Sequence, residues 1–594
     1  MLLLRSLLPY FHRHRVALGA GLVCVILGNL FQLAGPQFLQ RGIDAVASGA
    51  GAGRVAWIAA GLVLTATLTG AARFGMRQLL NGVSRRVEYD LRNDLYGHLT
   101  GLEPAFYLRH PTGDLMALST NDLGAVRMVA GPAIMYLTET LTRVAMALPL
   151  MAGIDGRLTL LGLIPMLGVP AVIVAMGPQI EKRFEEVQAH FGTLTAAAHE
   201  NLSGVRVVRA YRQEGAQIAR FEQLSLEYVR RNLRLARLWG RLFPLVMLVG
   251  GLGGVVTLWF GGRLVMDGTV TIGQFVAFST YLVLLVWPMI ALGWVTNLFQ
   301  RGAASMARIR RVLDAAPAIA DPPAPRPLAA ASGGRAVEFR DVWFRYPAPK
   351  PGTDGDGKEA AAPTPPWALA GVSFTAPAGA WVAIVGATGS GKSTLVELVP
   401  RLMDPERGAV LVDGVDVRAV ALGDLRRAIG FVPQDTFLFS DTIAENIALG
   451  DRPPEEVERA SRTAQLHETV AAFPAGYATM LGERGINLSG GQKQRTAIAR
   501  ALAREPDVVI LDDALSAVDT ETEAAILRGL RAAVQGRTAI VVSHRITAVR
   551  DAELIVVLDG GRVVETGRHE ELFAARGRYW ELLRRQQLEE SLAG

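Results

Sequence analysis

A glycine-rich loop beside an apolar strand is the first place where this sequence offers chemistry. The strand Trp381–Val385 leads into Gly386-Ala387-Thr388-Gly389-Ser390-Gly391-Lys392-Ser393, and a helical pattern follows. Glycines let backbone N–H groups curl around phosphates, Lys392 can meet the β- and γ-phosphates, and the Ser393 hydroxyl can ligate Mg²⁺. The match to the P-loop pattern is complete and its strand–loop–helix context is right. It predicts an ATP site formed by Gly386, Thr388, Gly389, Ser390, Gly391, Lys392, Ser393 and Thr394.

Two carboxylates follow a second apolar strand, Val508–Leu511. The first, Asp512, can hold Mg²⁺ directly or through water on the side opposite the P-loop. An acid at the end of a strand is common by itself. A P-loop site, however, requires an acidic Mg²⁺ ligand at such a position, so the independent P-loop favours this role for Asp512. We therefore predict a Mg²⁺ site that includes Ser393 and Asp512.

A short segment about twenty residues before that strand adds a third feature. Leu488-Ser489-Gly490-Gly491-Gln492 offers a hydroxyl, bare backbone amides and a helix N-terminus to a γ-phosphate. It resembles the signature motif of ABC transporters. The resemblance to ABC transporters of the exporter type, as type IV half-transporters, covers nearly the whole chain.

This resemblance implies roles for further residues. Tyr346 resembles the aromatic residue that stacks on adenine, Gln434 the Q-loop glutamine that senses Mg²⁺, and His544 the switch histidine at the γ-phosphate. Other matching segments are the exporter X-loop Gly482–Gly485, the D-loop from Ser516 to Asp519, and the coupling regions Thr112–Asp114, Asn121-Asp122 and Val208–Tyr211.

The sequence departs from the family at Asp513, where most members have the Glu that orients or deprotonates the attacking water. Asp is one methylene shorter, which withdraws the carboxylate by roughly 1.3 Å on an unchanged backbone, and a misplacement of about 1 Å can cost ~10²-fold in rate. Since the phosphate and Mg²⁺ ligands are intact, we expect tight nucleotide binding and poor hydrolysis. Gln434 and His544 are the other expected catalytic residues.

In this family, two nucleotide domains close head to tail, and each site joins one P-loop to the other chain's signature motif. An intact signature beside a weakened base resembles the degenerate-site subunit of heterodimeric bacterial exporters, many of which move drugs. A second half-transporter is then the expected partner. The alternative is a slow homodimer in which Asp513 performs the task.

The elements that must carry these residues include a membrane domain. Half of the 594 residues are hydrophobic and 20% are charged, so part of the chain is expected in lipid. The apolar stretches predict six spans, at about 16–40, 55–80, 128–154, 158–180, 242–262 and 268–300. Glu139 and Arg143 interrupt the third span four positions apart, so they can pair as a polar element of the transport pathway or as a structural ion pair.

The distribution of Lys and Arg orients these spans. The segments 1–15, 73–127 and 181–241 hold 21 of them, whereas the opposite side has only Arg41, Arg54, Arg157 and Arg263. Both termini and the nucleotide domain are therefore expected in the cytoplasm, with the spans in the inner (plasma) membrane. Because the cations flank apolar segments, we expect no nucleic-acid partner. The only cysteine, Cys24, excludes an internal disulfide or a thiolate metal cluster.

The predicted fold is thus a membrane all-α domain of six helices with long cytoplasmic extensions, followed by an α/β P-loop ATPase domain of the ABC type. The expected limits are 1–314 for the transmembrane domain, 315–336 for a Pro- and Ala-rich linker, 337–585 for the nucleotide-binding domain and 586–594 for a tail. Residues 348–366 are expected as a surface loop.

The predicted function is ATP-driven export of drugs or other amphipathic molecules, because the spans suggest an apolar cavity with few fixed charges. A lipid or peptide exporter, an importer with the exporter fold, and an ATP-gated channel or regulatory subunit remain alternatives. ATP and Mg²⁺ are the expected cofactors, and the lipid bilayer surrounds the spans.

Overall fold

The computed structural model describes the chain except residues 1, 330–332, 348–364, 516–519, 544–548 and 594. The chain divides into two compact units. The first comprises residues 1–100 and 113–315, and the second comprises residues 101–112 and 316–594. Most of the expected surface loop 348–366 lies outside the described residues.

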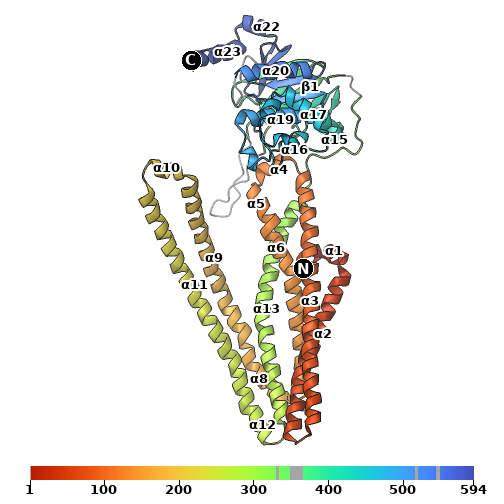
Figure 1. Ribbon diagram of the computed structural model, residues 1–594, viewed down its shortest axis with the longest axis vertical. Helices are drawn as coiled ribbons and strands as arrows, with labels where there is room; N and C mark the ends of the chain where they lie inside the picture. The colour runs from red at the N-terminus through yellow and green to blue at the C-terminus, as the bar shows by residue number, and fades with distance from the viewer. Residues whose placement is uncertain (1, 330–332, 348–364, 516–519, 544–548, 594) are drawn as a thin grey trace. The chain divides into compact units, whose positions relative to one another are not determined.

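The first unit is all helical (Figure 1). Among the described residues, five helical segments are long and apolar enough to cross a membrane: 15–47, 52–101, 156–203, 214–266 and 272–313. A further helix, α7, carries Glu139 and Arg143, and the predicted six-helix membrane domain is confirmed. The helices are α1 Leu2–Arg13, α2 Arg15–Ala47, α3 Ala52–Gly101, α5 Thr112–Ala117, α6 Leu123–Met128, α7 Ile134–Ala152, α8 Gly156–Met166, α9 Gly168–Ser203, α10 Val205–Ala210, α11 Glu214–Val256, α12 Gly262–Met266 and α13 Ile272–Leu313.

Several of these helices are much longer than a bilayer requires. At about 1.5 Å per residue, α3 with its 50 residues is about 75 Å long, whereas the hydrocarbon layer needs about 30 Å. Helices α9 and α11 pack along each other and are joined through the short helix α10. The expected extensions beyond the membrane are therefore present.

The core of the first unit lies where α2, α7, α8 and α13 meet. Buried side chains there include Leu33, Met151, Phe278 and Tyr281. The Tyr281 hydroxyl donates to the Leu33 carbonyl at 3.0 Å, which satisfies the polar end of a side chain that is 1% exposed. This bond ties α13 to α2 inside the membrane domain.

The expected pairing of Glu139 and Arg143 is confirmed. Arg143 is 3% exposed, forms an ion pair with Glu139, and donates to Asn29 Oδ1 at 3.2 Å. Asn29 in turn donates to the Glu139 carbonyl at 2.9 Å. Because a charge in hydrocarbon is costly, these bonds let α2 and α7 hold an arginine inside the bundle.

A second buried polar cluster joins the segment after α5 to the far end of α13. Asp122, which is 8% exposed, accepts from Ser305 Oγ at 2.7 Å and from Arg308 Nε at 2.9 Å. Burial raises the pKa of Asp122, but the hydrogen bonds from Arg308 and Ser305 outweigh burial and lower it. The carboxylate is therefore the stable form in the fold.

The second unit contains two sheets. One is antiparallel, in the order β2-β1-β4-β5, with β2 Leu369–Ala376, β1 Val337–Phe344, β4 Arg407–Val412 and β5 Val415–Asp416. The other has the order β10-β9-β3-β8-β7-β6, with β10 Arg562–Gly567, β9 Leu554–Asp559, β3 Trp381–Gly386, β8 Thr538–Val542, β7 Val508–Asp512 and β6 Ile429–Val432. Strands β9, β3, β8, β7 and β6 are parallel, so their carboxyl ends share one edge.

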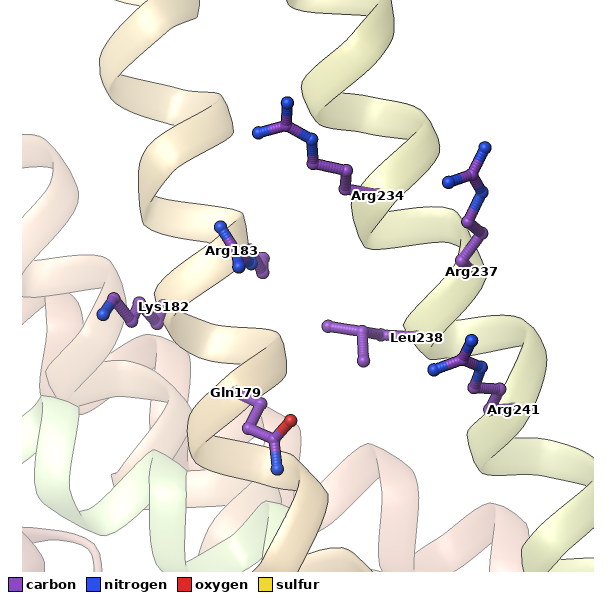
Figure 2. Close-up of a pocket in the computed structure, with 7 residues that line it drawn as sticks. All are labelled: Gln179, Lys182, Arg183, Arg234, Arg237, Leu238 and Arg241. Carbon is purple, nitrogen blue, oxygen red and sulfur yellow. The ribbon is translucent and has the colours of Figure 1, made fainter.

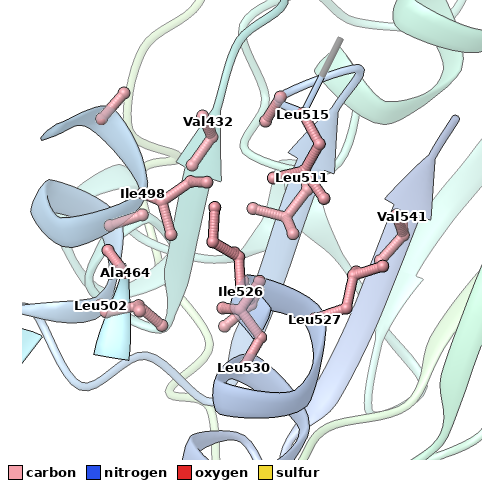
Figure 3. Packing of buried hydrophobic residues seen from close by; sticks show 14 of the residues in the cluster. Val432, Ala464, Ile498, Leu502, Leu511, Leu515, Ile526, Leu527, Leu530 and Val541 are labelled. Carbon is pink, nitrogen blue, oxygen red and sulfur yellow. The ribbon is translucent and has the colours of Figure 1, made fainter. Parts of the chain in front are cut away.

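Helices cover this sheet and close an apolar core. Figure 3 shows Ile498 and Ile526 packed beside Leu511 of β7, and all three are at most 2% exposed. The helices of the unit are α4 Pro104–Arg109, α14 Lys392–Glu397, α15 Leu422–Arg427, α16 Ile443–Ala448, α17 Pro454–Thr463, α18 His467–Ala471, α19 Gly490–Leu502, α20 Thr520–Ala533, α22 His569–Ala575 and α23 Arg578–Ala593. The predicted α/β ATPase fold is confirmed.

The expected linker is attached to the second unit along much of its length. The Ala318 N–H donates to Glu103 Oε2 at 3.0 Å, and the Arg326 N–H donates to the Ala419 carbonyl at 2.7 Å. Asp321 accepts from the Leu422 N–H at 2.7 Å. The short helix α4, which begins next to Glu103, is thereby held to the same unit.

The Asp122 cluster leads to a stability prediction. We expect Asp122→Ala to lower the free energy of unfolding by about 1.5–3 kcal/mol, because it leaves the Arg308 guanidinium and Ser305 hydroxyl without their shared acceptor. Thermal unfolding of the purified full chain measures the effect. Asp114→Ala, at an exposed position on α5, is the control, and an equal loss in both variants would contradict the prediction.

Candidate functional site

The P-loop lies between β3 and α14 and depends on close backbone approaches. A Cβ on Gly386 would lie 2.3 Å from the Leu558 carbonyl oxygen, and one on Gly391 would lie 2.6 Å from that of Ala368. Gly391 also has a φ of 97°, in the left-handed region that glycine adopts without strain. These two positions therefore require glycine for the loop to curl at the carboxyl edge of the sheet.

Lys392 is held inside this loop. Its Nζ donates to the Gly386 and Ala387 carbonyls, both at 2.9 Å, and the residue is 6% exposed. Burial lowers the pKa of Lys392, while the nearby charges of Asp512 and Asp513 act in the opposite direction. Because its partners are neutral carbonyl oxygens, the amine is ready to bind a stronger acceptor such as a phosphate.

The hydroxyl of Ser390 supports the same ligand. Ser390 Oγ is buried and has no hydrogen-bond partner among the described residues. A buried hydroxyl without a partner is costly, and a phosphate oxygen would supply the acceptor it lacks. The loop therefore fits the triphosphate that its sequence predicts.

Asp512 ends β7 and faces the P-loop helix. Ser393 Oγ donates to Asp512 Oδ1 at 3.1 Å, and Asp512 is 2% exposed. Burial raises the pKa of Asp512, and the adjacent Asp513 raises it further. No group of three or more His, Cys, Asp or Glu side chains suited to a metal occurs in the described ranges. A hydroxyl and a carboxylate this close suit Mg²⁺, which commonly takes one or two carboxylates together with phosphate oxygens.

Asp513, the expected base position, has a fixed backbone. Its φ is 46°, in the left-handed region, and its N–H donates to the Val542 carbonyl at 3.0 Å. Val542 is the last residue of β8. The position of the Asp513 main chain is therefore set by the sheet.

The structure also places two residues whose roles came from the resemblance. The Tyr346 hydroxyl lies 2.9 Å from Thr394 Oγ1 on α14, and its ring meets Phe344 edge to face at 5.2 Å. Gln434 is exposed two residues after β6, whose Val432 pairs with Leu511 beside Asp512. Both residues thus lie near the P-loop or the Asp512 edge.

The signature segment forms the start of a helix. Ser489 caps α19, since its Oγ accepts from the Gln492 N–H at 3.3 Å and its own N–H donates to Gln492 Oε1 at 2.9 Å. Ser489 and Gly490 are exposed, whereas Leu488 is buried. The helix start therefore presents its amides at the surface, where a second chain can reach them.

His544, Ser516 and Asp519 lie outside the described residues.

Glu397, which was not among the expected site residues, lies four residues after Ser393 on α14. Burial raises its pKa and the Asp512 charge raises it further. The sequence signal for Glu397 was its position four residues after Ser393, because side chains with this spacing lie on one face of a helix.

The membrane unit contains a cavity of about 360 Å³ between α2, α3, α7 and α13. Arg73 Nη2 donates to Gln32 Oε1 at 2.8 Å and lies 3.9 Å from Glu139. The expectation of an apolar cavity with few fixed charges is therefore wrong here, since three arginines and one glutamate line it. Its lining residues are Gln32, Arg73, Met76, Arg77, Met135, Tyr136, Glu139, Arg143, Val283, Leu284 and Trp287.

A helical membrane unit joined to a P-loop unit with a signature helix defines an ATP-driven membrane transporter. Comparison with known proteins gives the particular family. Residues 18–289 match the ABC transporter transmembrane region, and residues 369–516 match the ABC transporter ATPase model.

Relatives match over nearly the full length. The probable multidrug resistance ABC transporter ATP-binding/permease protein YheI of Bacillus subtilis is 38% identical, covering 98% of this chain and 96% of its own. Multidrug resistance-like ATP-binding protein MdlA of Escherichia coli is 37% identical, covering 100% and 98%. An ATP-dependent lipid A-core flippase of Syntrophus aciditrophicus is 32% identical, covering 97% and 93%.

A solved structure agrees with these relatives. A bacterial Atm1-family ABC exporter with ATP bound has a TM-score of 0.78 and 30% identity, covering 96% of this chain and 98% of its own. The chain belongs to the ABC transporter family, as a half-transporter of the exporter type. It is an ATP-binding, ATP-hydrolysing exporter subunit of the inner membrane, and it works as a dimer.

The P-loop geometry leads to a binding prediction. We expect Lys392→Met to weaken ATP binding by about 10- to 100-fold, because hydrogen bonds to a charged group contribute about 1.5–3 kcal/mol. Fluorescence titration of the purified full chain with a labelled ATP measures this. Arg427→Met, whose side chain is 73% exposed on α15, is the control. Unchanged affinity in a folded Lys392→Met protein would show that the amine does not bind the phosphates.

Proposed function

We propose that this half-transporter pairs with a different half-transporter and divides the work of ATP hydrolysis with it. Its own P-loop, with Mg²⁺ held by Ser393, Asp512 and Gln434, binds ATP and cleaves it slowly. Its signature segment, Leu488–Gln492, completes the partner's faster site. The observation that carries this proposal is Asp513 at the position of the catalytic base.

The local backbone supports a weakened base. A main chain that moves toward the nucleotide could compensate for the shorter reach of an Asp side chain. At Asp513 the N–H bond to Val542 and the left-handed backbone oppose such a movement, because β8 is an interior strand of the sheet. The carboxylate is then withdrawn by about one methylene, and a displacement of about 1 Å can lower a rate by ~10²-fold.

The other half of the division rests on the signature helix. Ser489 and Gln492 cap α19 reciprocally, so the N-terminus of this helix is formed before any partner arrives. A preformed and exposed helix start binds a γ-phosphate without paying for its own ordering. The chain therefore retains the signature segment that completes a partner's site, although Asp513 at its own base position is one methylene shorter than Glu.

We propose amphipathic molecules as the cargo. The names of two relatives refer to multidrug resistance and that of another to lipid A-core. The cavity combines apolar side chains such as Trp287 and Met135 with Arg73, Arg77 and Arg143 against a single Glu139. This lining favours an amphipathic cargo that carries an acidic group. A homodimeric lipid or peptide exporter is the second candidate, supported by the flippase relatives.

The hydrolysis proposal is tested by changing the base. The full chain alone should hydrolyse ATP slowly, and Asp513→Glu should raise turnover by up to about 10²-fold. In the assembled pair, Asp513→Glu should leave transport working, whereas removal of the partner's catalytic Glu should nearly abolish hydrolysis. Asp451→Glu, in an exposed loop, is the matched control. Brisk turnover by the unmodified chain alone would instead establish the homodimer.

The cargo proposal is tested by transport into inside-out vesicles. We expect ATP-driven uphill accumulation of an amphipathic probe with an acidic group, and a preference of about tenfold over its cationic analogue, as one favourable charge contact predicts. Arg77→Gln should reduce that preference. Downhill flux alone would identify a channel, and equal accumulation of both probes would exclude charge selection by the cavity.

A further inference from the structure

A strongly basic pocket lies between α9 and α11 of the first unit. It has a volume of about 420 Å³ and is lined by Gln179, Lys182, Arg183, Arg234, Arg237, Leu238 and Arg241. Figure 2 shows Arg234 and Leu238 reaching from α11 toward α9. The lining therefore holds five cations and no carboxylate.

Most of these cations form no direct ion pair in the part of the chain that the structure describes. Arg183 binds Glu186 at 2.7 Å. Lys182, Arg234, Arg237 and Arg241 are exposed and make no ion pair among the described residues. Of the nearby acids, Glu227 forms ion pairs with Arg230 and Arg231 and lies close enough to Arg234 to interact with its charge, and Glu181 lies 3.8 Å from Arg301. A pocket of like charges that is not neutralised internally attracts an anion.

The pocket also has a defined depth relative to the membrane. Lys182 and Arg183 follow the apolar stretch 158–180 almost directly, and Arg241 immediately precedes the stretch 242–262. Arg234 lies seven residues before Arg241, which is about 10 Å along α11. The headgroup layer on each side of the hydrocarbon is about 5–8 Å thick. The backbone positions of Lys182, Arg183, Arg237 and Arg241 therefore lie at the level of the cytoplasmic headgroups, and that of Arg234 lies just beyond them.

Apolar surface continues from the pocket toward the hydrocarbon. Phe243 is 59% exposed, Met247 is 67% exposed, and Val174 on α9 is 72% exposed. A ligand with a charged head and apolar chains can thus satisfy both the cations and this surface. A free phosphate would satisfy only the cations.

We propose that this pocket binds the headgroup of an anionic phospholipid from the cytoplasmic leaflet. Guanidinium groups bind phosphate in a bidentate manner, and the anionic leaflet supplies such groups at the required depth. Bound between α9 and α11, the lipid neutralises the repulsion among Arg234, Arg237 and Arg241. The proposal concerns a site outside the nucleotide machinery and does not depend on the division of hydrolysis.

Native mass spectrometry of the full-length transporter tests this directly. The protein is titrated with phosphatidylglycerol, with phosphatidylcholine as the zwitterionic reference. We expect tighter binding of phosphatidylglycerol, and Arg234→Gln/Arg241→Gln should weaken it by about 30-fold at about 1 kcal/mol per removed cation. Arg209→Gln/Arg220→Gln removes the same charge at exposed positions at least 14 residues from the pocket and should leave binding unchanged.

Two further experiments distinguish lipid recognition from loss of fold and from binding of a soluble anion. Arg234→Lys/Arg241→Lys keeps the charge and should retain most of the binding, which distinguishes recognition from loss of fold. Inorganic phosphate at millimolar concentration should not displace the lipid, and displacement would assign the pocket to a soluble anion. Equal binding of both lipids, or equal losses in the two Gln double variants, would overturn the proposal.

Discussion

The buried carboxylate of Asp512 is the constraint on which the nucleotide site depends. It is 2% exposed at the end of β7, and burial of an ionised acid is costly unless hydrogen bonds and a cation compensate it. Ser393 supplies one hydrogen bond from 119 residues away in the sequence, and Lys392 supplies nearby charge. The parallel order of β3, β8 and β7 brings these groups to one edge. A bound Mg²⁺ with a triphosphate would supply the cation that the buried negative charge of Asp512 requires.

A buried charge in the membrane unit is likewise stabilised by hydrogen bonds and an opposite charge. Arg143 is tolerated among apolar helices because Asn29 and Glu139 satisfy its guanidinium. Arg143 and Glu139 lie on the wall of a cavity that is also lined by Arg73 and Arg77. A polar element of the transport pathway and a structural ion pair were alternatives from the sequence. The ion pair is present and the same two side chains line a cavity, so the two alternatives do not exclude each other.

Much of this arrangement could be predicted from the sequence because its signals are local. The P-loop, the strand before Asp512 and the pairing of Glu139 with Arg143 each depend on spacing within one or two elements. The charged cavity could not be predicted, because Gln32, Arg73 and Glu139 come from three helices whose facing sides no linear pattern reveals. The left-handed backbone of Asp513 likewise depends on its bond to β8, which is a tertiary contact. His544 and the D-loop remain predictions.

The central claim is that this chain's own site holds ATP while the partner's site cleaves it. The most direct measurement traps the working pair during turnover with a photoreactive, radiolabelled ATP and identifies the nucleotide cross-linked to each chain. We predict mainly uncleaved ATP at the site containing Lys392 and Asp512, and mainly ADP at the partner's P-loop. Equal amounts of ADP at both sites would contradict the account.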